Sequence, residues 1–510
     1  MSRARPLLAL ACASLLGCQA ILGLDEGKDR QTTSTTSSSS STTTSSTSST
    51  SSMTGGAGGA GGTGTTTTTG AGGMGGATTS TTGAGGGTTT TTTGSGGAGG
   101  TSSTSTTGAG GMGGATTSTT GAGGAAPSCA DGLKNGGETD IDCGGGCPQA
   151  CALGKACGAG VDCQSGDCFA GACGAVLLLA GGNAASVLGG ELRPNGTWTT
   201  SVLGGATTFG PALAITSGSK GVGLIRENGT AALRAVTWSA GQWSAFSDVG
   251  PLVTTREQPS ISAAGAGARA AFHGDNFKHY HASWNGLVWS PEAEAVGEGA
   301  DQSAGPSPPQ IAASPAFPAG AEATVVFIAN AVNKPFARNR VAGAWAASQM
   351  VDGSATNFNL APDVVAMTAG PELMMVWMRS DDQVLYSTRS NGVWSAGAVV
   401  PSAFTASRAS LAALPGGGAI LAFQGTDNFL YYALYAAGAW GAVLPFSAPN
   451  VPLAGSPSVT HGIGGATAEI AFAKSTDNIV YHARYIGGSW TVPVVVGGSN
   501  MSRVALASAP

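Results

Sequence analysis

Two short stretches decide the fold: Ser407–Pro415 reads SRASLAALP, and the last nine residues, Ser502–Pro510, read SRVALASAP. The two copies lie about 95 positions apart. A sequence motif that recurs in this way indicates a structural repeat. The question is which repeat the second copy completes.

Tryptophans mark the repeat. Seven of them follow a glycine-containing turn at intervals of 45 to 56 residues, and we call them the landmark tryptophans: Trp198, Trp243, Trp289, Trp345, Trp394, Trp440 and Trp490. Each interval holds short alternating or apolar runs with turn signals every 8 to 12 residues. This pattern predicts an all-β domain at 175–510, a seven-bladed β-propeller with four strands in each blade.

The first unit, which starts AVLLLAG at Ala175, lacks the leading strand that the other units have. The last unit is followed by a spare strand, SRVALASAP. Because an open ring would expose two unpaired sheet edges, we expect this C-terminal strand to insert as the innermost strand of blade 1.

The first 17 residues have a basic start and a short apolar run, as a secretory signal peptide does. Their end, Leu15–Cys18, resembles the lipobox of bacterial lipoproteins, which implies cleavage before Cys18 and acylation of that cysteine. Gln19 follows the cysteine where an aspartate would indicate retention in the inner membrane, so we expect the outer membrane. Residues 18–127 then form a low-complexity linker, nearly all Thr, Ser, Gly and Ala from Gln31 onward, which predicts a disordered tether.

A cysteine-rich module follows at 128–174. Its eight cysteines predict four disulfides, with the pairing left open: Cys129, Cys143, Cys147, Cys151, Cys157, Cys163, Cys168 and Cys173. A zinc site is the alternative for these cysteines. The stretch DGLKNGGETDID, from Asp131 to Asp142, is a weak match to a calcium loop and a better match to turns. With the cysteines after it, this stretch resembles a module common in surface lipoproteins of gliding soil bacteria.

Several function classes find no support. The net charge of −5 and the 22 Lys plus Arg give no basic footprint for nucleic acid. Neither a nucleophile elbow nor a His-Glu-x-x-His helix occurs, so we expect no enzyme and no cofactor. His273, His279 and His281 invite a metal site, but a turn at Gly274–Asn276 should keep them off one common face, so no metal is expected. The Asp-box and arginine-proline motifs of sialidases are missing too.

A second sequence pattern indicates a ligand-binding function. Five residues before each landmark tryptophan stands an arginine or an aromatic residue, and these are our ligand-binding candidates: Arg193, Trp238, Trp284, Arg340, Arg389, Tyr435 and Tyr485. Aromatic faces stack on sugar rings, and guanidinium groups donate to hydroxyls. Here the chain resembles the propeller lectins that bind monosaccharides such as fucose between adjacent blades, although no recurring acidic partner accompanies these positions. The alternative is that these side chains fill the space between blades.

The sequence thus predicts a lipid-anchored surface protein whose propeller recognises a ligand without catalysis. The expected partners are glycans between the blades, or a surface protein if the propeller is a scaffold. A sialidase-like glycoside hydrolase is the second alternative.

Overall fold

The computed structural model describes residues 128–182, 185–251, 253–296, 307–313, 321–329, 332–357, 359–447 and 449–509. The chain divides into two units, Met1–Gly113 and Gly114–Pro510, and the described residues belong to the second. The predicted signal peptide, Cys18 and the linker lie outside the described residues.

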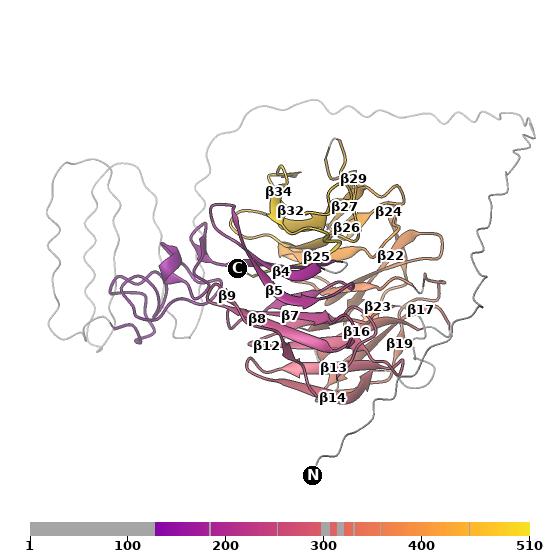
Figure 1. Ribbon diagram of the computed structural model, residues 1–510, viewed down its shortest axis with the longest axis horizontal. Helices are drawn as coiled ribbons and strands as arrows, with labels where there is room; N and C mark the ends of the chain where they lie inside the picture. Colours follow the sequence, from indigo (N-terminus) through magenta and orange to yellow (C-terminus); the bar gives the residue numbers. More distant parts are fainter. Residues whose placement is uncertain are drawn as a thin grey trace, which may run out of the picture. The chain divides into compact units, whose positions relative to one another are not determined.

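Seven antiparallel sheets confirm the expected seven-bladed, all-β propeller (Figure 1). Blade 1 consists of β35 (Arg503–Ala509), β3 (Ala175–Gly182), β4 (Ala185–Leu192) and β5 (Trp198–Ala206). Blade 2 consists of β6 (Ala212–Ile215), β7 (Lys220–Arg226), β8 (Leu233–Ser239), β9 (Gln242–Trp243) and β10 (Ser247–Asp248). Blade 3 consists of β11 (Ser260–Ala264), β12 (Gly267–His273), β13 (His279–Trp284) and β14 (Trp289–Val296).

The next four blades have the same order, with the outer strand in two pieces. Blade 4 consists of β15 (Gln310–Ala313), β16 (Ala321–Ala329), β17 (Lys334–Val341), β18 (Ala344–Trp345) and β19 (Gln349–Met350). Blade 5 consists of β20 (Asp363–Ala366), β21 (Leu373–Met378), β22 (Gln383–Ser390), β23 (Val393–Trp394) and β24 (Ala398–Phe404). Blade 6 consists of β25 (Ser410–Leu414), β26 (Gly418–Gln424), β27 (Leu430–Ala436), β28 (Ala439–Trp440) and β29 (Leu444–Pro445). Blade 7 consists of β30 (Ser458–His461), β31 (Ala468–Ala473), β32 (Val480–Ile486), β33 (Ser489–Trp490) and β34 (Val494–Gly497).

Helical structure in the described residues amounts to two 3-10 turns, η1 (Gly160–Asp162) and η4 (Pro415–Gly417). No helix in the described part of the chain is both long enough and apolar enough to cross a membrane.

The last strand closes the ring, as the sequence predicts. β35 pairs with β3 over seven consecutive residue pairs, from Gly181 opposite Arg503 to Ala175 opposite Ala509. In Figure 1 the magenta strands of blade 1 lie next to the yellow strands of blade 7. β3 is buried along its whole length, because β35 covers the edge that would otherwise be free.

The turn before the landmark tryptophan is a tight hairpin in five blades. Its two central residues both have positive φ, and the second is always glycine: Ala240–Gly241, Ala342–Gly343, Asn391–Gly392, Ala437–Gly438 and Gly487–Gly488. A two-residue turn with positive φ at both positions fits the right-handed twist of the strands, and glycine adopts that conformation without strain. This requirement explains why glycine and tryptophan recur together.

The landmark tryptophan of a blade packs against the preceding blade. In the clearest cases the indole lies edge-on to a ring on the third strand of the preceding blade. The pairs, with centroids 5.0 to 5.9 Å apart, are Trp198–His482, Trp345–His281, Trp440–Tyr386 and Trp490–Tyr432. Trp243 covers Gly189 of blade 1 instead, where a Cβ atom would lie 3.0 Å from the indole. The landmark tryptophans therefore hold blades together.

The cysteine-rich module adds a two-stranded sheet, β1 (Cys168–Phe169) and β2 (Ala172–Cys173). All eight cysteines form disulfides, and the pairing is Cys129–Cys147, Cys143–Cys151, Cys157–Cys168 and Cys163–Cys173. Each closes a short loop and contributes about 2–4 kcal/mol to stability. Arg193 of blade 1 donates to Asp167 of the module at 3.2 Å.

Removing residues 503–510 should abolish the single cooperative unfolding transition of the propeller, because β3 then becomes an uncovered edge. Circular dichroism during denaturation would measure this. An unchanged transition would show that β35 is a dispensable tail.

A milder pair of variants controls for nonspecific effects of truncation. Leu506→Ala removes a side chain that is 6% exposed and should lower the free energy of unfolding by about 2–4 kcal/mol. Val202→Ala changes a residue of the same blade that is 73% exposed and should alter it by less than about 0.5 kcal/mol.

Candidate functional site

Charged side chains from two blades meet at the boundary between blades 3 and 4, and we call this partly exposed group the 3/4 cleft. Glu322, at the start of β16, accepts a hydrogen bond from Arg269 of β12 at 2.7 Å. Arg340 of β17 donates to the same carboxylate oxygen, and the Gly343 N–H donates to the other oxygen at 2.9 Å. One carboxylate thus contacts two guanidinium groups, one from each blade.

Aromatic and imidazole rings border this cluster. Arg269 Nη1 lies 3.4 Å from His281 Nε2, so His281 accepts there and carries its proton on Nδ1. Trp345 of β18 stands edge-on to His281. Burial, with Arg269 and Arg340 nearby, lowers the pKa of His281 to about 3, so this imidazole is neutral at physiological pH.

Solvent reaches the charged groups of the 3/4 cleft. The exposed fraction of the side chain is 31% for Glu322, 18% for Arg269 and 12% for Arg340. Burial alone would raise the pKa of Glu322, but the Gly343 N–H and the two arginines outweigh it and lower that pKa. The cleft therefore offers one ionised acceptor and two strong donors beside an aromatic wall.

Arg340 is one of the sequence-predicted ligand contacts, and the other two arginines lie in similar surroundings. Arg389 is 3.6 Å from Glu372 and also reaches Thr324 of blade 4 at 3.4 Å. Arg193 is 3.1 Å from Glu191, whose pKa burial raises to about 7. The Arg389 and Glu372 side chains are only 6% and 10% exposed, which leaves this pair less accessible than the 3/4 cleft.

The four aromatic candidates are buried. Each pairs directly with the landmark tryptophan of its own blade, and their exposed fractions are at most 8%: Trp238, Trp284, Tyr435 and Tyr485. Their burial favours the packing role that the sequence left open. Sugar contact by these four side chains remains a prediction.

The expectation that the candidate positions lack a recurring acidic partner is wrong for the three arginines, each of which lies near a glutamate. Glu322 and Glu372 each stand one residue before the residue paired with Arg340 or Arg389, and Glu191 stands two residues before Arg193. The first two glutamates lie 17 or 18 positions from their arginines along the chain, across a hairpin. Aligning the second strand of each blade with the third in hairpin register would have placed Glu322 and Glu372 beside their arginines.

A comparable charged cluster between blades 7 and 1 has its carboxylate closed to solvent, although its arginine is partly exposed. Glu469 contacts His482 at 3.0 Å and Arg484 at 3.0 Å, and Trp198 of blade 1 covers the histidine. The Glu469 side chain has no exposed surface. This cluster matches the 3/4 cleft in composition, but its acceptor has no access to a ligand.

The structure places the three histidines of the possible metal site differently from the sequence-based expectation. The turn at Gly274–Asn276 is present, but it does not separate the histidines as expected. His273 pairs directly opposite His279, and His281 follows two residues later, so all three share a face. In the described part of the chain, none of the groups of three potential metal ligands within reach of one another includes these histidines.

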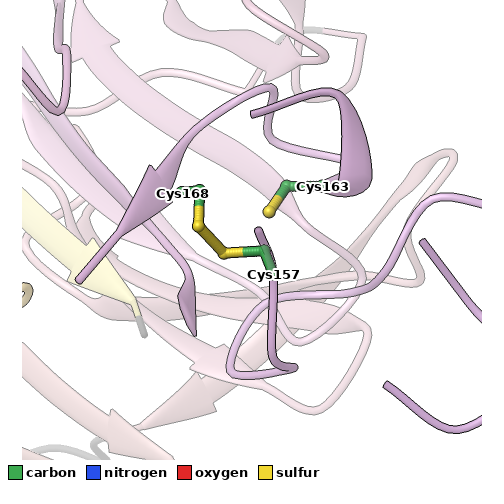
Figure 2. A group of neighbouring side chains, drawn as sticks. All are labelled: Cys157, Cys163 and Cys168. Atoms are coloured by element: carbon green, nitrogen blue, oxygen red, sulfur yellow. A yellow bond between two sulfur atoms is a disulfide. The ribbon is translucent and has the colours of Figure 1, made fainter. Parts of the chain in front are cut away.

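The groups of potential metal ligands in the described residues contain disulfide-bonded cysteines. Cys157, Cys163 and Cys168 lie together (Figure 2), but Cys157 is bonded to Cys168 and Cys163 to Cys173. Disulfide sulfur offers no thiolate, which rules out the zinc alternative for these cysteines.

In the stretch that weakly matches a calcium loop, the aspartates accept hydrogen bonds from backbone N–H groups. Asp131 accepts from the Leu133 N–H at 2.9 Å, and Asp142 accepts from the Asp131 N–H at 2.9 Å. These carboxylates shape turns.

Comparison with known proteins gives fold-level similarities only. No protein-family model matches the chain, and no curated protein matches it. Among solved structures, it is similar to AofleA from Arthrobotrys oligospora, with 12% identity over 58% of this chain and 88% of that one and a TM-score of 0.43. It is also similar to the fucose-specific lectin of Aleuria aurantia, with 15% identity, 56% and 95% coverage and a TM-score of 0.40. A Lactobacillus plantarum protein has 11% identity, 65% and 99% coverage and a TM-score of 0.43. TM-scores below 0.5 are too low to transfer a function.

Proposed function

We propose that this protein recognises carbohydrate without catalysis, in clefts between adjacent blades, with the 3/4 cleft as the principal site. The observation that carries the proposal is the group formed by Arg269, Glu322 and Arg340, which joins two blades and remains accessible to solvent.

A sugar presents several hydroxyl groups and a ring oxygen on one side and C–H groups on the other. The guanidinium groups of Arg269 and Arg340 can donate to sugar oxygens, and the Glu322 carboxylate can accept from hydroxyls. Trp345 supplies an apolar wall against which C–H groups can pack. A ligand that inserts here replaces part of the Arg269–Glu322 contact with hydrogen bonds of its own.

The sequence supports recognition at a cell surface. Acylation of Cys18 would anchor the chain in the outer membrane, and the Thr/Ser/Gly-rich residues 18–127 would tether the propeller to that anchor. A coil of this composition and about 110 residues has a root-mean-square reach of roughly 60 Å.

Arg269→Ala should weaken sugar binding at least tenfold, which corresponds to about 1.4 kcal/mol, because it removes a charge-assisted donor. The measurement is a glycan array with the full-length chain, followed by calorimetry. Methyl α-L-fucoside is the first ligand to titrate, because the sequence resembles lectins that bind fucose. A neutral sugar should bind with little dependence on salt.

Arg379→Ala is the matched control. Arg379 forms an exposed ion pair with Asp381 at the turn between β21 and β22, so its loss should leave binding unchanged. The proposal fails if no glycan binds, or if both variants weaken binding equally. Trp284 is a poor probe, because truncating a tryptophan that is 4% exposed costs about 3–5 kcal/mol of stability.

The anchoring proposal has its own test. Radiolabelled palmitate should be incorporated into the wild-type chain expressed in a Gram-negative host and should be lost in Cys18→Ser. Absence of label from the wild type would contradict lipidation.

A further inference from the structure

The seven innermost strands enclose a channel along the propeller axis with a volume of about 850 Å³. Neighbouring inner strands run in parallel, since the Ile311 N–H donates to Ser260 Oγ and the Ala313 N–H donates to Ser262 Oγ, both at 3.0 Å. The first residues of all seven strands therefore lie around the same mouth of the channel.

The repeated phrase of the sequence places two arginines at this mouth. Arg408 precedes β25 in SRASLAALP, and Arg503 begins β35 in SRVALASAP. They come from blades 6 and 1, which flank blade 7, and Ser456 of blade 7 stands at the corresponding position between them. All three residues line the channel.

Arg408 is fixed by its neighbours. Its Nη2 donates to Gln310 Oε1 at 2.7 Å and to Asp363 Oδ1 at 3.0 Å. Because the Gln310 oxygen faces Arg408, the amide Nε2 points elsewhere, and it is buried without a hydrogen-bond partner among the described residues. Gln310 is itself only 3% exposed and lines the channel.

Two more donors of the mouth lack partners in the described structure. Ser456 Oγ is buried without a hydrogen bond. The Arg503 guanidinium has no hydrogen bond or ion pair with any described side chain, although it is close enough to Arg408 for the second positive charge to add to burial in lowering its pKa. Arg503 is an exposed residue, but Gln310 Nε2 and Ser456 Oγ are buried, and a buried donor without a partner is costly. These two groups therefore favour a ligand that supplies acceptors.

The net charge of the residues that line the channel also favours an anion. Asp363, Arg408 and Arg503 are the aspartate and the two arginines among the lining residues, which include neither lysine nor glutamate, so the mouth carries one more positive than negative charge. We propose that the channel mouth binds the oxyanion group of a small molecule, a carboxylate or a phosphate, between Arg503, Ser456 and Gln310. This site is separate from the 3/4 cleft and requires neither blade 3 nor a sugar ring.

The test is calorimetric titration of the full-length chain in chloride-free buffer with three probes: inorganic phosphate, glucuronate and neutral glucose. Phosphate or glucuronate should bind saturably, and binding should weaken with salt. Comparing the two anions distinguishes a phosphate site from a carboxylate site. Arg503→Gln should weaken anion binding at least tenfold, and Ser456→Ala should weaken it by a smaller factor.

Two controls separate this site from the proposed carbohydrate site. Arg269→Ala should leave anion affinity unchanged while it weakens sugar binding, and Arg503→Gln should do the reverse. Circular dichroism must show that Arg503→Gln retains the fold, since Arg503 belongs to β35. The proposal is overturned if neither anion binds the wild type, or if a folded Arg503→Gln variant binds as the wild type does.

Discussion

The pairing of β35 with β3 is the constraint on which the rest of the structure depends. Without β35, the inner edge of β3 would be unpaired, and blade 1 would lack the strand that packs against β30 of blade 7 and β6 of blade 2. Seven residue pairs between the ends of the propeller sequence prevent this. The same pairing brings Trp198 of blade 1 against His482 of blade 7 and carries Arg503 to the channel mouth. Ring closure, packing between blades 7 and 1 and the complete axial channel all depend on the pairing of β35 with β3.

The landmark tryptophans show why a regular pattern is a poor guide to a binding site in a repeat protein. What recurs in every blade is what every blade needs, namely a tight turn with glycine and an indole that fills the space beside the preceding blade. Binding groups are more visible where the pattern breaks. Arg269 stands where blades 2 and 4 have Val222 and Thr324, and it reaches from blade 3 across to blade 4. The 3/4 cleft and the channel mouth are both departures of this kind.

Sequence alone predicted the number of blades, the hairpins and the closing strand, because these follow from local chemistry: turn residues, alternation and one spare strand. The closing strand β35 (Arg503–Ala509), for example, lies within the spare stretch SRVALASAP. The contact between Glu322 and Arg340 was missed from the sequence, because this contact depends on the register of the β16–β17 hairpin. Disulfide pairing was also out of reach, since cysteine spacing does not fix it. The faces of His273, His279 and His281 were predicted wrongly, because residues opposite each other across a hairpin share a face.

The most direct test of ring closure is amide hydrogen exchange at residues Val504–Ala507, compared with the inner strands β20 and β25. If β35 is an integral strand, its amides exchange only when the whole propeller unfolds, with the same free energy as those of β20 and β25. Exchange at β35 that is orders of magnitude faster, while β20 and β25 stay protected, would contradict the account.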